Sequence, residues 1–360
     1  MEGTTSAAVP RGELRVEAES LDPQRLELVK HEWQQLEEVS PNATPYVGFD
    51  WLHAWAQIYE PRRLAVVRVT DSRDKPVALG LLDTSSRTRW SFAGSPVTSD
   101  RRLLCAKGSE AAAWAAFGSW LLETPRAWAS LDGEGAGPAV ATLPRVRLDP
   151  VSFFRFDLPD SFEAYLANRP SETRKRFRQR LRYLERADGR VSEAVSSEHA
   201  VHDLIRLHLD RARSKGERHP QMDGRLEAML VLLAADRTLV ATEVRTRDEL
   251  LGVAVHCDYH GTRYFYNGGI REAGSQLSPG VLLELDAVRT AIDRGLGRFD
   301  LGPGYYSYKH ELGGVPVARY TFMSASPTPR GTTAWVRHTV HRHLCPRAGR
   351  ERLRRLVRRR

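Results

Sequence analysis

The segment Gln276–Gly280 combines residue types that start a helix and leave its first amide groups uncovered. Ser278 is a favourable N-cap, Pro279 suits the first helical position, and Gly280 leaves the next amides accessible. Such a helix start presents free backbone N–H groups and the positive end of a dipole, and these can hold a phosphate or pyrophosphate. The same residues also begin helices that bind nothing, so both interpretations stay open.

A second set of polar residues follows the strand-like run Arg298–Leu301, where the chain turns at Gly302-Pro303-Gly304. Asp300 could hold an amine or orient the nearby Lys309, or it could only cap the turn. Tyr308 could donate a proton, or its ring could simply pack this loop together with its tyrosine neighbours. Lys309 could take part in the chemistry, or it could form only a surface salt bridge, which would contribute little to stability.

Three strand-like runs come before these segments, at 238–246, 250–259 and 262–270. Their links are short enough for hairpins, and their alternation of apolar and polar residues indicates an antiparallel meander. His256 and Asp258 alternate on the second run, so they face one side, and either could act as a base. A packed, hydrogen-bonded strand residue is the alternative for His256.

Helices are predicted at 173–187, 198–215 and 223–235 before the meander, and a strand at 315–324 after the turn. In the first of these helices the apolar residues fall on one side and arginines fill the others. That basic surface is either a solvated helix face or a positive wall for a polyanion, such as coenzyme A or a tRNA acceptor arm.

Residues 155–324 resemble the cellulose-biosynthesis-type acetyltransferases, a branch of the GNAT superfamily that is related to the Fem-type aminoacyltransferases. The resemblance covers about half of the chain and rests on short matching pieces in the same order. These pieces are Phe162–Leu166, Arg174–Arg178, Leu250–Ala254, Ser278–Gly280, Phe299–Gly302 and Tyr308-Lys309.

The resemblance implies an α/β (α+β) fold of the GNAT type and transfer of an acyl group from acetyl-CoA, or another acyl-CoA, to an amine by direct attack. Lys309 matches a lysine of the Fem-like pattern, where a cation beside the reacting carbonyl would stabilise its developing negative charge. Backbone N–H groups of the strand Tyr264–Gly268 could polarise the same carbonyl. We expect no metal ion to take part.

One motif departs from the GNAT pattern of Arg or Gln, two residues, Gly, one residue, then Gly or Ala. This chain has Gln276-Leu277-Ser278-Pro279-Gly280 instead, and the departure motivates an alternative donor, an aminoacyl-tRNA. The candidate donor-binding residues are Gln276, Ser278, Gly280, Val281, Leu282 and Tyr266. The candidate catalytic residues are Lys309, Asp300, Tyr308, His256 and Asp258.

The N-terminal half repeats the same plan more faintly, which predicts two GNAT-like halves in tandem. A helix at 26–39 and a second one capped by Asp50 precede strands at 64–69, 76–82 and near 90–92. A helix at 109–122 and a strand at 127–131 complete the repeat. We expect a degenerate domain at 12–148, a linker at 144–150, an acyltransferase domain at 150–326 and a basic tail at 335–360.

The tail carries ten Arg and one Glu. The sum of these charges, +9, equals the net charge of the whole chain. Such a segment could contact anionic lipid or RNA, and it motivates a third hypothesis, a non-catalytic scaffold at the membrane surface. His338, His341, His343 and Cys345 in the tail do not match the common zinc spacings. Three scattered cysteines and the lack of a long apolar run indicate a cytoplasmic protein, peripheral to the membrane if the tail binds lipid.

Overall fold

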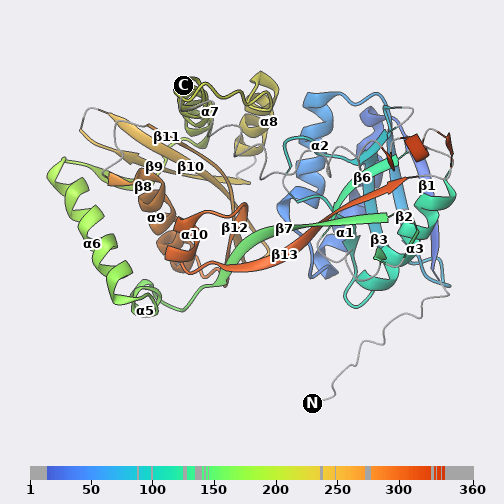
Figure 1. Cartoon of the computed structure of the whole chain (residues 1–360), viewed down its shortest axis with the longest axis horizontal. Helices are drawn as coiled ribbons and strands as arrows, with labels where there is room; N and C mark the ends of the chain where they lie inside the picture. The colour runs from blue at the N-terminus through green and yellow to red at the C-terminus, as the bar shows by residue number, and fades with distance from the viewer. Residues whose placement is uncertain are drawn as a thin grey trace, which may run out of the picture.

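The structure, a computed structural model, describes residues 14–336 except 87–88, 99, 125–127, 134–139, 142, 145, 236–237, 248, 272–276, 326–327, 330 and 334. Within these residues the strands form a 13-stranded sheet in the order β1-β2-β3-β4-β6-β13-β7-β12-β11-β10-β9-β8, with β5 paired to β3 (Figure 1). The tail histidines and Cys345 lie outside the described residues.

The N-terminal half supplies one end of this sheet. Its elements are β1 (Arg15–Leu21), α1 (Lys30–Val39), α2 (Phe49–Tyr59), β2 (Leu64–Thr70), β3 (Pro76–Asp83), β4 (Arg89–Phe92), β5 (Leu104–Cys105), α3 (Glu110–Glu123) and β6 (Trp128–Gly133). Asp50 is not the cap of α2, because Gly48 holds that position and Asp50 lies in the first turn.

The C-terminal half supplies the other end. Its elements are β7 (Val146–Asp157), α5 (Phe162–Ala167), α6 (Ser171–Arg186), β8 (Arg190–Glu193), α7 (Ser197–Ser214), α8 (Gly224–Ala235), β9 (Leu239–Arg245), β10 (Leu250–Tyr259), β11 (Thr262–Ile270), α9 (Pro279–Asp293), β12 (Arg298–Pro303), α10 (Ser307–Glu311) and β13 (Val315–Ala325). The predicted meander, helices and closing strand are confirmed, whereas Tyr308-Lys309 lies in the short helix α10 rather than in a turn.

The two halves repeat one pattern, as the sequence predicts. In the first half β4 and β6 pair in parallel, and α3 connects them. In the second half β11 and β12 pair in parallel, and α9 connects them. In each case an antiparallel meander leads into the parallel pair, so α9 and α3 occupy equivalent places in the two halves.

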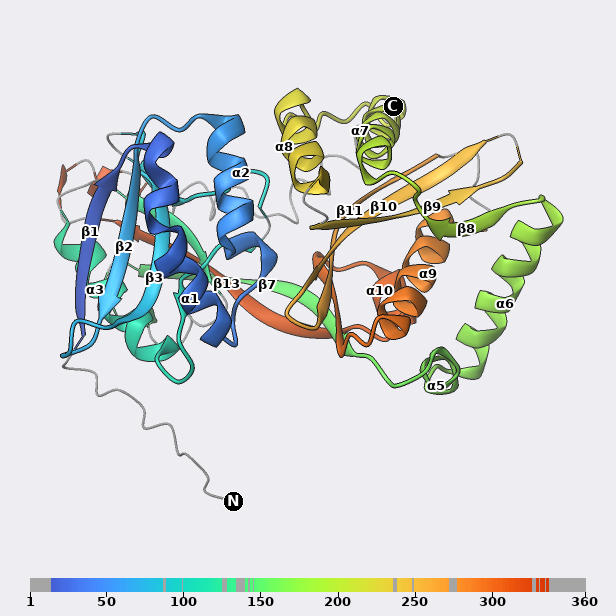
Figure 2. The same cartoon turned by 180° about the vertical axis from the view of Figure 1, so that it is seen from behind.

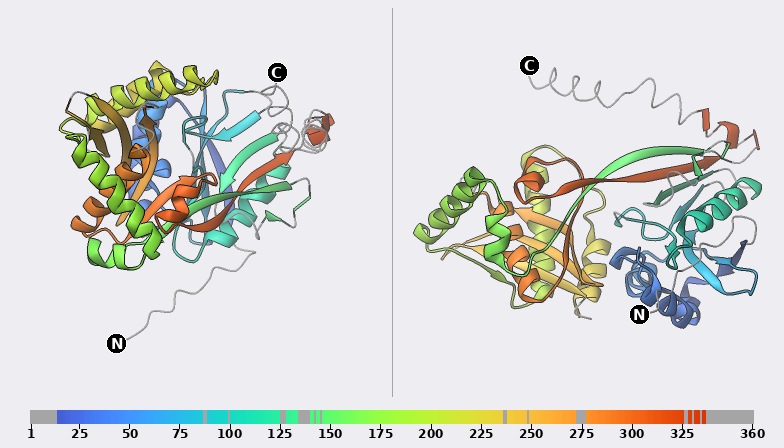
Figure 3. Two further views of the ribbon diagram at one scale, coloured as in Figure 1. Left: turned by 60° about the vertical axis from the view of Figure 1, so that its left-hand side comes forward. Right: turned by 90° about the horizontal axis from the view of Figure 1, so that it is seen from below.

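Strands β7 and β13 join the halves into one sheet, and Figure 3 shows them running side by side from one half to the other. β13 follows β12 in the chain yet pairs with β6, while β7 follows β6 yet pairs with β12. The prediction of a linker at 144–150 is therefore wrong, because residues from Val146 onward are part of β7. The domain boundary between residues 148 and 150 stays a prediction.

Helices cover both faces of the sheet in the C-terminal half (Figure 2). Alternate residues of β10 contact opposite layers: Val253 and Val255 join the core that holds α7, α8 and α2, whereas Ala254 packs with α9. The first core includes Trp33 and Trp51 of the N-terminal half, so the two halves share buried apolar surface. Helices α7 and α9 therefore lie on opposite faces of this part of the sheet.

Helix α7 approaches β11 most closely at Gly269. A Cβ atom there would lie 2.8 Å from the Leu204 carbonyl oxygen and 2.9 Å from Leu207 Cβ, so Gly269→Ala would push α7 off the sheet. We expect this variant to lower the free energy of unfolding by about 1–3 kcal/mol in urea denaturation. Gly268→Ala is the control, because its Cβ would meet no atom closer than 3.5 Å; an equal loss in both variants would contradict the packing argument.

In the described part of the chain, no helix is both long and apolar enough to cross a bilayer. The same residues contain no group of three or more His, Cys, Asp or Glu side chains placed to hold a metal ion.

Candidate functional site

The parallel strands β11 and β12 separate shortly after they begin to pair. Their described register covers Thr262 to Tyr264, opposite Arg298 to Asp300. Beyond Tyr264, β11 continues to Ile270, whereas β12 bends at Gly302, whose φ of +70° favours glycine. The register between β11 and β10 also shifts at Val255/His256. This separation leaves backbone groups of β11 facing an opening in the sheet.

A cavity of about 830 Å³ lies at this opening, a volume within the range of small-molecule sites. It is lined by α7 on one face of the sheet, the end of β11, the first turns of α9 on the other face, and two tyrosines from the region of α10. Its polar lining residues are His208, Arg211, Lys215, Glu217, His219, Asn267, Arg271, Ser278, Glu284, Tyr306 and Tyr308.

The N-terminus of α9 opens into this cavity. Ser278 occupies the N-cap position as predicted, but its φ is 49° and its side chain makes no capping hydrogen bond. Gly280 has open space beside it, since the nearest atom to a Cβ there would be Ile270 Cγ2 at 4.0 Å. Arg211 of α7 and Lys215, the C-cap of that helix, line the same cavity. The dipole of α9 and these cations make the place suitable for an anionic group.

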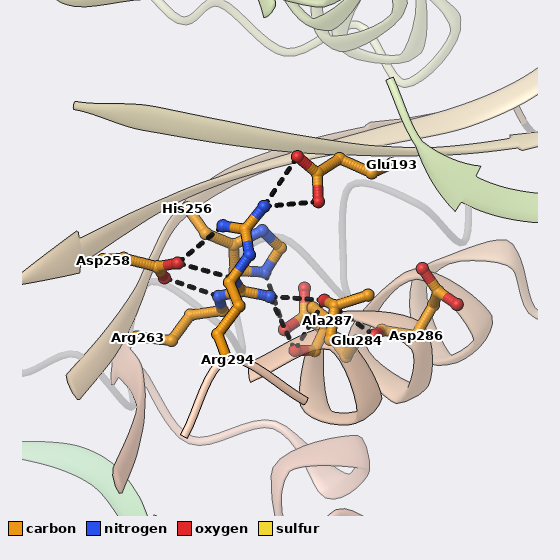
Figure 4. A network of polar contacts seen from close by, with 9 residues as sticks. Glu193, His256, Asp258, Arg263, Glu284, Asp286, Ala287 and Arg294 are labelled. Carbon is orange, nitrogen blue, oxygen red and sulfur yellow. Dashed lines mark hydrogen bonds and ion pairs between the residues drawn. The ribbon is translucent and has the colours of Figure 1, made fainter. Parts of the chain in front are cut away.

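Glu284 of α9 brings a carboxylate to the cavity wall, and the sequence analysis did not identify it. The residue is 2% exposed, and its Oε2 lies 3.3 Å from Nε2 of the fully buried His256 (Figure 4). Among the residues that the structure describes, His256 Nδ1 has no hydrogen-bond partner. The signal available in the sequence was a lone glutamate within the apolar run that begins α9, a position that the helical periodicity buries.

Asp258 lies on the same side of β10 as His256 but is fully engaged elsewhere. Arg263 binds both of its oxygens, at 2.6 and 2.7 Å, and Arg294 binds it at 2.8 Å (Figure 4). Burial alone would raise the pKa of Asp258, but its bonds and charge interactions with the two arginines outweigh burial and hold that pKa below its usual value. A carboxylate held in this way is a poor base.

Lys309 lies behind the cavity wall rather than in it. Its ammonium group donates to the carbonyl oxygens of Gly302 at 3.0 Å and Pro303 at 2.7 Å. Burial lowers its pKa to about 8, although the charges of Asp300 and Glu284 act in the opposite direction. Lys309 thus fixes the backbone at the bend of β12.

Asp300 takes the capping role that the sequence left open. Its Oδ1 accepts from the backbone N–H of Gly302 at 2.8 Å, and its Oδ2 accepts from Arg319 at 3.0 Å. Through these bonds the Asp300 carboxylate connects the bend of β12 to β13. Asp300 is not one of the residues that line the cavity.

The remaining candidates divide between the cavity and its surroundings. Tyr308, Ser278, Gly280 and Val281 line the cavity, whereas Leu282 points to the opposite face of α9 and packs with Leu184. The Tyr266 hydroxyl donates to the Val97 carbonyl oxygen at 3.1 Å, on the side of the N-terminal half. Gln276 lies outside the described residues.

The basic helix α6 flanks a separate, smaller cavity of about 320 Å³ on that opposite face of α9. Arg178 and Leu181 line it, together with Asp286 and Arg289 of α9. Within the described ranges, none of the residues of α6 lines the larger cavity. The predicted positive wall is therefore separated by α9 from the opening between β11 and β12.

Residues 171–310, most of the C-terminal half, match the model of the acetyltransferase (GNAT) domain family. This match spans α6 to α10 and includes every residue that lines the larger cavity. A search of curated proteins gives no match to this sequence.

Three solved structures of similar fold cover both halves of the chain. FemX aligns over 85% of this chain and 96% of its own, with a TM-score of 0.56 and 11% identity. The C-terminal domain of a putative lysylphosphatidylglycerol synthetase from Agrobacterium fabrum aligns over 87% and 95%, with a TM-score of 0.54 and 10% identity. A tandem GNAT protein from the clavulanic acid biosynthesis pathway aligns over 88% and 99%, with a TM-score of 0.51 and 15% identity.

These similarities concern the fold, because the identities are low. They confirm the tandem GNAT-like fold that the sequence predicts.

Proposed function

We propose that this protein is an N-acyltransferase of the cellulose-biosynthesis type, which transfers an acyl group from an acyl-CoA to an amine. The observation that carries this proposal is the cavity where β11 leaves β12, with the N-terminus of α9, whose N-cap side chain makes no capping bond, and the cations Arg211, Lys215 and Arg271 at its wall. This arrangement suits a donor that joins an anionic group to a reactive carbonyl, since the α9 amides suit the anion and the β11 amides suit the carbonyl.

Three groups of the chain have distinct tasks in this proposal. The N-terminus of α9 with Arg211 and Lys215 binds the phosphates of the donor. Backbone N–H groups of β11 that face the opening polarise the acyl carbonyl. Tyr308 keeps its proton at neutral pH, because burial and the nearby Glu284 and Tyr306 raise its pKa, and so its hydroxyl can donate a hydrogen bond to the leaving sulfur.

A second candidate function is Fem-type transfer from an aminoacyl-tRNA. It is favoured by the arginine-rich face of α6, whose Arg178 and Arg182 are exposed, and by the departure at Gln276–Gly280 from the usual motif. The tail at 335–360 adds a basic segment that could bind tRNA or an anionic membrane surface, which a non-catalytic scaffold would also use. In each case we propose a cytoplasmic protein, peripheral to the membrane where the tail binds lipid.

Donor binding separates these functions. If the donor is an acyl-CoA, acetyl-CoA at a hundred times its Kd should stabilise the full chain by about 2.7 kcal/mol, measured as a rise in melting temperature. A panel from acetyl-CoA to longer acyl-CoA esters defines the acyl group. No shift with any ester, together with salt-sensitive binding of charged tRNA, would replace the proposal by the Fem-type function. Vesicle binding without either donor would favour the scaffold.

A further inference from the structure

We propose that Glu284 is the catalytic base of this transferase and that the cavity beside it takes a cationic primary amine as the acceptor. The inference rests on the proposed function and specifies its second substrate. Glu284 lies in the second turn of α9 and lines the cavity that Tyr308 also lines. It thus faces the space where an acceptor would meet a bound donor.

Glu284 differs from the other buried carboxylates in the kind of partner that it has. Asp100 pairs with Arg102 and Arg319, and Asp300 also pairs with Arg319. Asp286 pairs with Arg289. Among the described residues no arginine or lysine forms an ion pair with Glu284, although it is as buried as the others. The charge of Lys309 is near enough to act on Glu284 but forms no ion pair with it, so the place beside the carboxylate that a directly bonded cation would take is open to a substrate ammonium group.

The contact with His256 bears on the charge beside Glu284. A neutral His256 that donates its Nε2 proton to Glu284 leaves, among the described residues, only an acceptor, Nδ1, without a partner. A charged His256 would leave a buried N–H donor without a partner there. A neutral His256 orients Glu284 without supplying a cation to it, and it is a positioning residue rather than a catalytic one.

The proposed reaction moves one acyl group from the thioester to the amine and releases one proton to the solvent. The acceptor enters as an ammonium ion, and one proton passes to the Glu284 carboxylate, which leaves a neutral amine. The nitrogen lone pair attacks the carbonyl carbon of the thioester, the C–N bond forms, and the C–S bond breaks. The nitrogen then loses its second proton, and the thiolate takes up one proton and leaves as the thiol. Glu284 returns its proton to the solvent.

Other titratable groups surround Glu284, and for this reason the tests below compare substitutions at one pH. Those from the elements packed against α9 are His256 of β10, Tyr165 of α5, and Tyr308 and Lys309 of α10. Those across the cavity are His208, Arg211, Lys215, Glu217, His219 and Arg271.

The decisive variant is Glu284→Gln, which keeps the shape of the side chain and removes its charge. We expect kcat/KM for 1,5-diaminopentane, L-lysine or D-glucosamine to fall about 10²–10⁴-fold with acetyl-CoA as donor, measured by thiol release. Acetyl-CoA should bind the variant as it binds the wild type. Glu227→Gln is the matched control, because Glu227 pairs with His202 at 2.6 Å on the surface and should leave the rate unchanged.

The role of His256 is tested by two variants and by the kinetics of each substrate. His256→Phe removes the donor, and we expect kcat for the amine to fall while the Kd for acetyl-CoA stays that of the wild type, because Glu284 loses the contact that orients it. His256→Gln supplies an N–H donor again and should restore kcat toward that of the wild type. A loss of rate that His256→Gln does not restore would show that His256 is only structural and would overturn its positioning role.

The outcomes separate this inference from the proposed function. If the wild type binds no acyl-CoA, the proposed function fails. If the wild type binds acetyl-CoA but neither binds nor acylates any of the three amines, the cationic-acceptor inference fails. If Glu284→Gln acylates amines at the rate of the wild type, the base is another group, while the transferase function stands.

Discussion

Replacing Arg319 by Met is expected to lower the free energy of unfolding by about 3–5 kcal/mol, the largest effect on stability predicted for this chain. Arg319 of β13 donates to Asp300 at 3.0 Å and to Asp100 at 2.8 Å, and all three side chains are buried. Its guanidinium also lies 3.9 Å from the ring centroid of Phe153. Removing the arginine leaves two carboxylates without a shared cation in a site from which water is excluded.

The effect should be cooperative across the molecule, because Asp100 lies 219 residues before Arg319 and belongs to the N-terminal half. Urea denaturation followed by tryptophan fluorescence measures the loss. Arg298→Met is the control, since Arg298 pairs with Asp157 at the surface and should contribute no more than about 1 kcal/mol. Equal losses in the two variants would show that the buried pairs do not hold the halves together.

Lys309 should make the stability of the protein rise between pH 7 and pH 10. Burial lowers its pKa to about 8 from an ordinary value of 10.5, so in this window the unfolded chain holds a proton that the folded chain has released. Stability therefore increases as pH rises through the folded pKa, by about 2–3 kcal/mol at pH 10 relative to pH 7. Below pH 7 both states are charged, and this contribution no longer changes.

The measurement is the difference in free energy of unfolding between the wild type and Lys309→Met at several pH values. Methionine does not titrate, so the subtraction removes groups common to both proteins. At pH 7 the variant also tests the carbonyl oxygens of Gly302 and Pro303, which lose their donor. A difference that stays constant from pH 7 to pH 10 would mean that Lys309 titrates as an exposed lysine.

The sequence predicted the elements of the fold well, because their periodicities are local. The antiparallel runs at 250–259 and 262–270 have the bounds of β10 and β11, and the face of Trp33 and Leu36 is buried in α1. The path of the chain between the halves was not predictable in this way. Whether Val146–Asp157 is a linker or a strand depends on β12 and β13, which lie far along the sequence.

The site was predicted in part for the same reason. The start of α9 is a local motif, so Ser278 and Gly280 could be named as candidates from the sequence, and both line the cavity. Asp258 lies opposite Arg263 in the predicted hairpin, so that partner was within reach of the sequence, whereas its second partner Arg294 comes from the C-cap of α9. Glu284 was missed because its distinguishing feature is structural: among the described residues, no arginine or lysine forms an ion pair with it. No spacing in the sequence reveals this feature.

The most direct test of the proposed donor site is calorimetric titration of acetyl-CoA into the full chain and into two glycine variants. Gly280→Asp places a carboxylate at the start of α9, where the donor phosphates would bind, and acetyl-CoA binding should be lost. Gly224→Asp makes the same change at the first residue of α8, where a side chain also meets open space, and binding should match the wild type. Equal acetyl-CoA affinity in all three proteins would contradict a donor site at the N-terminus of α9.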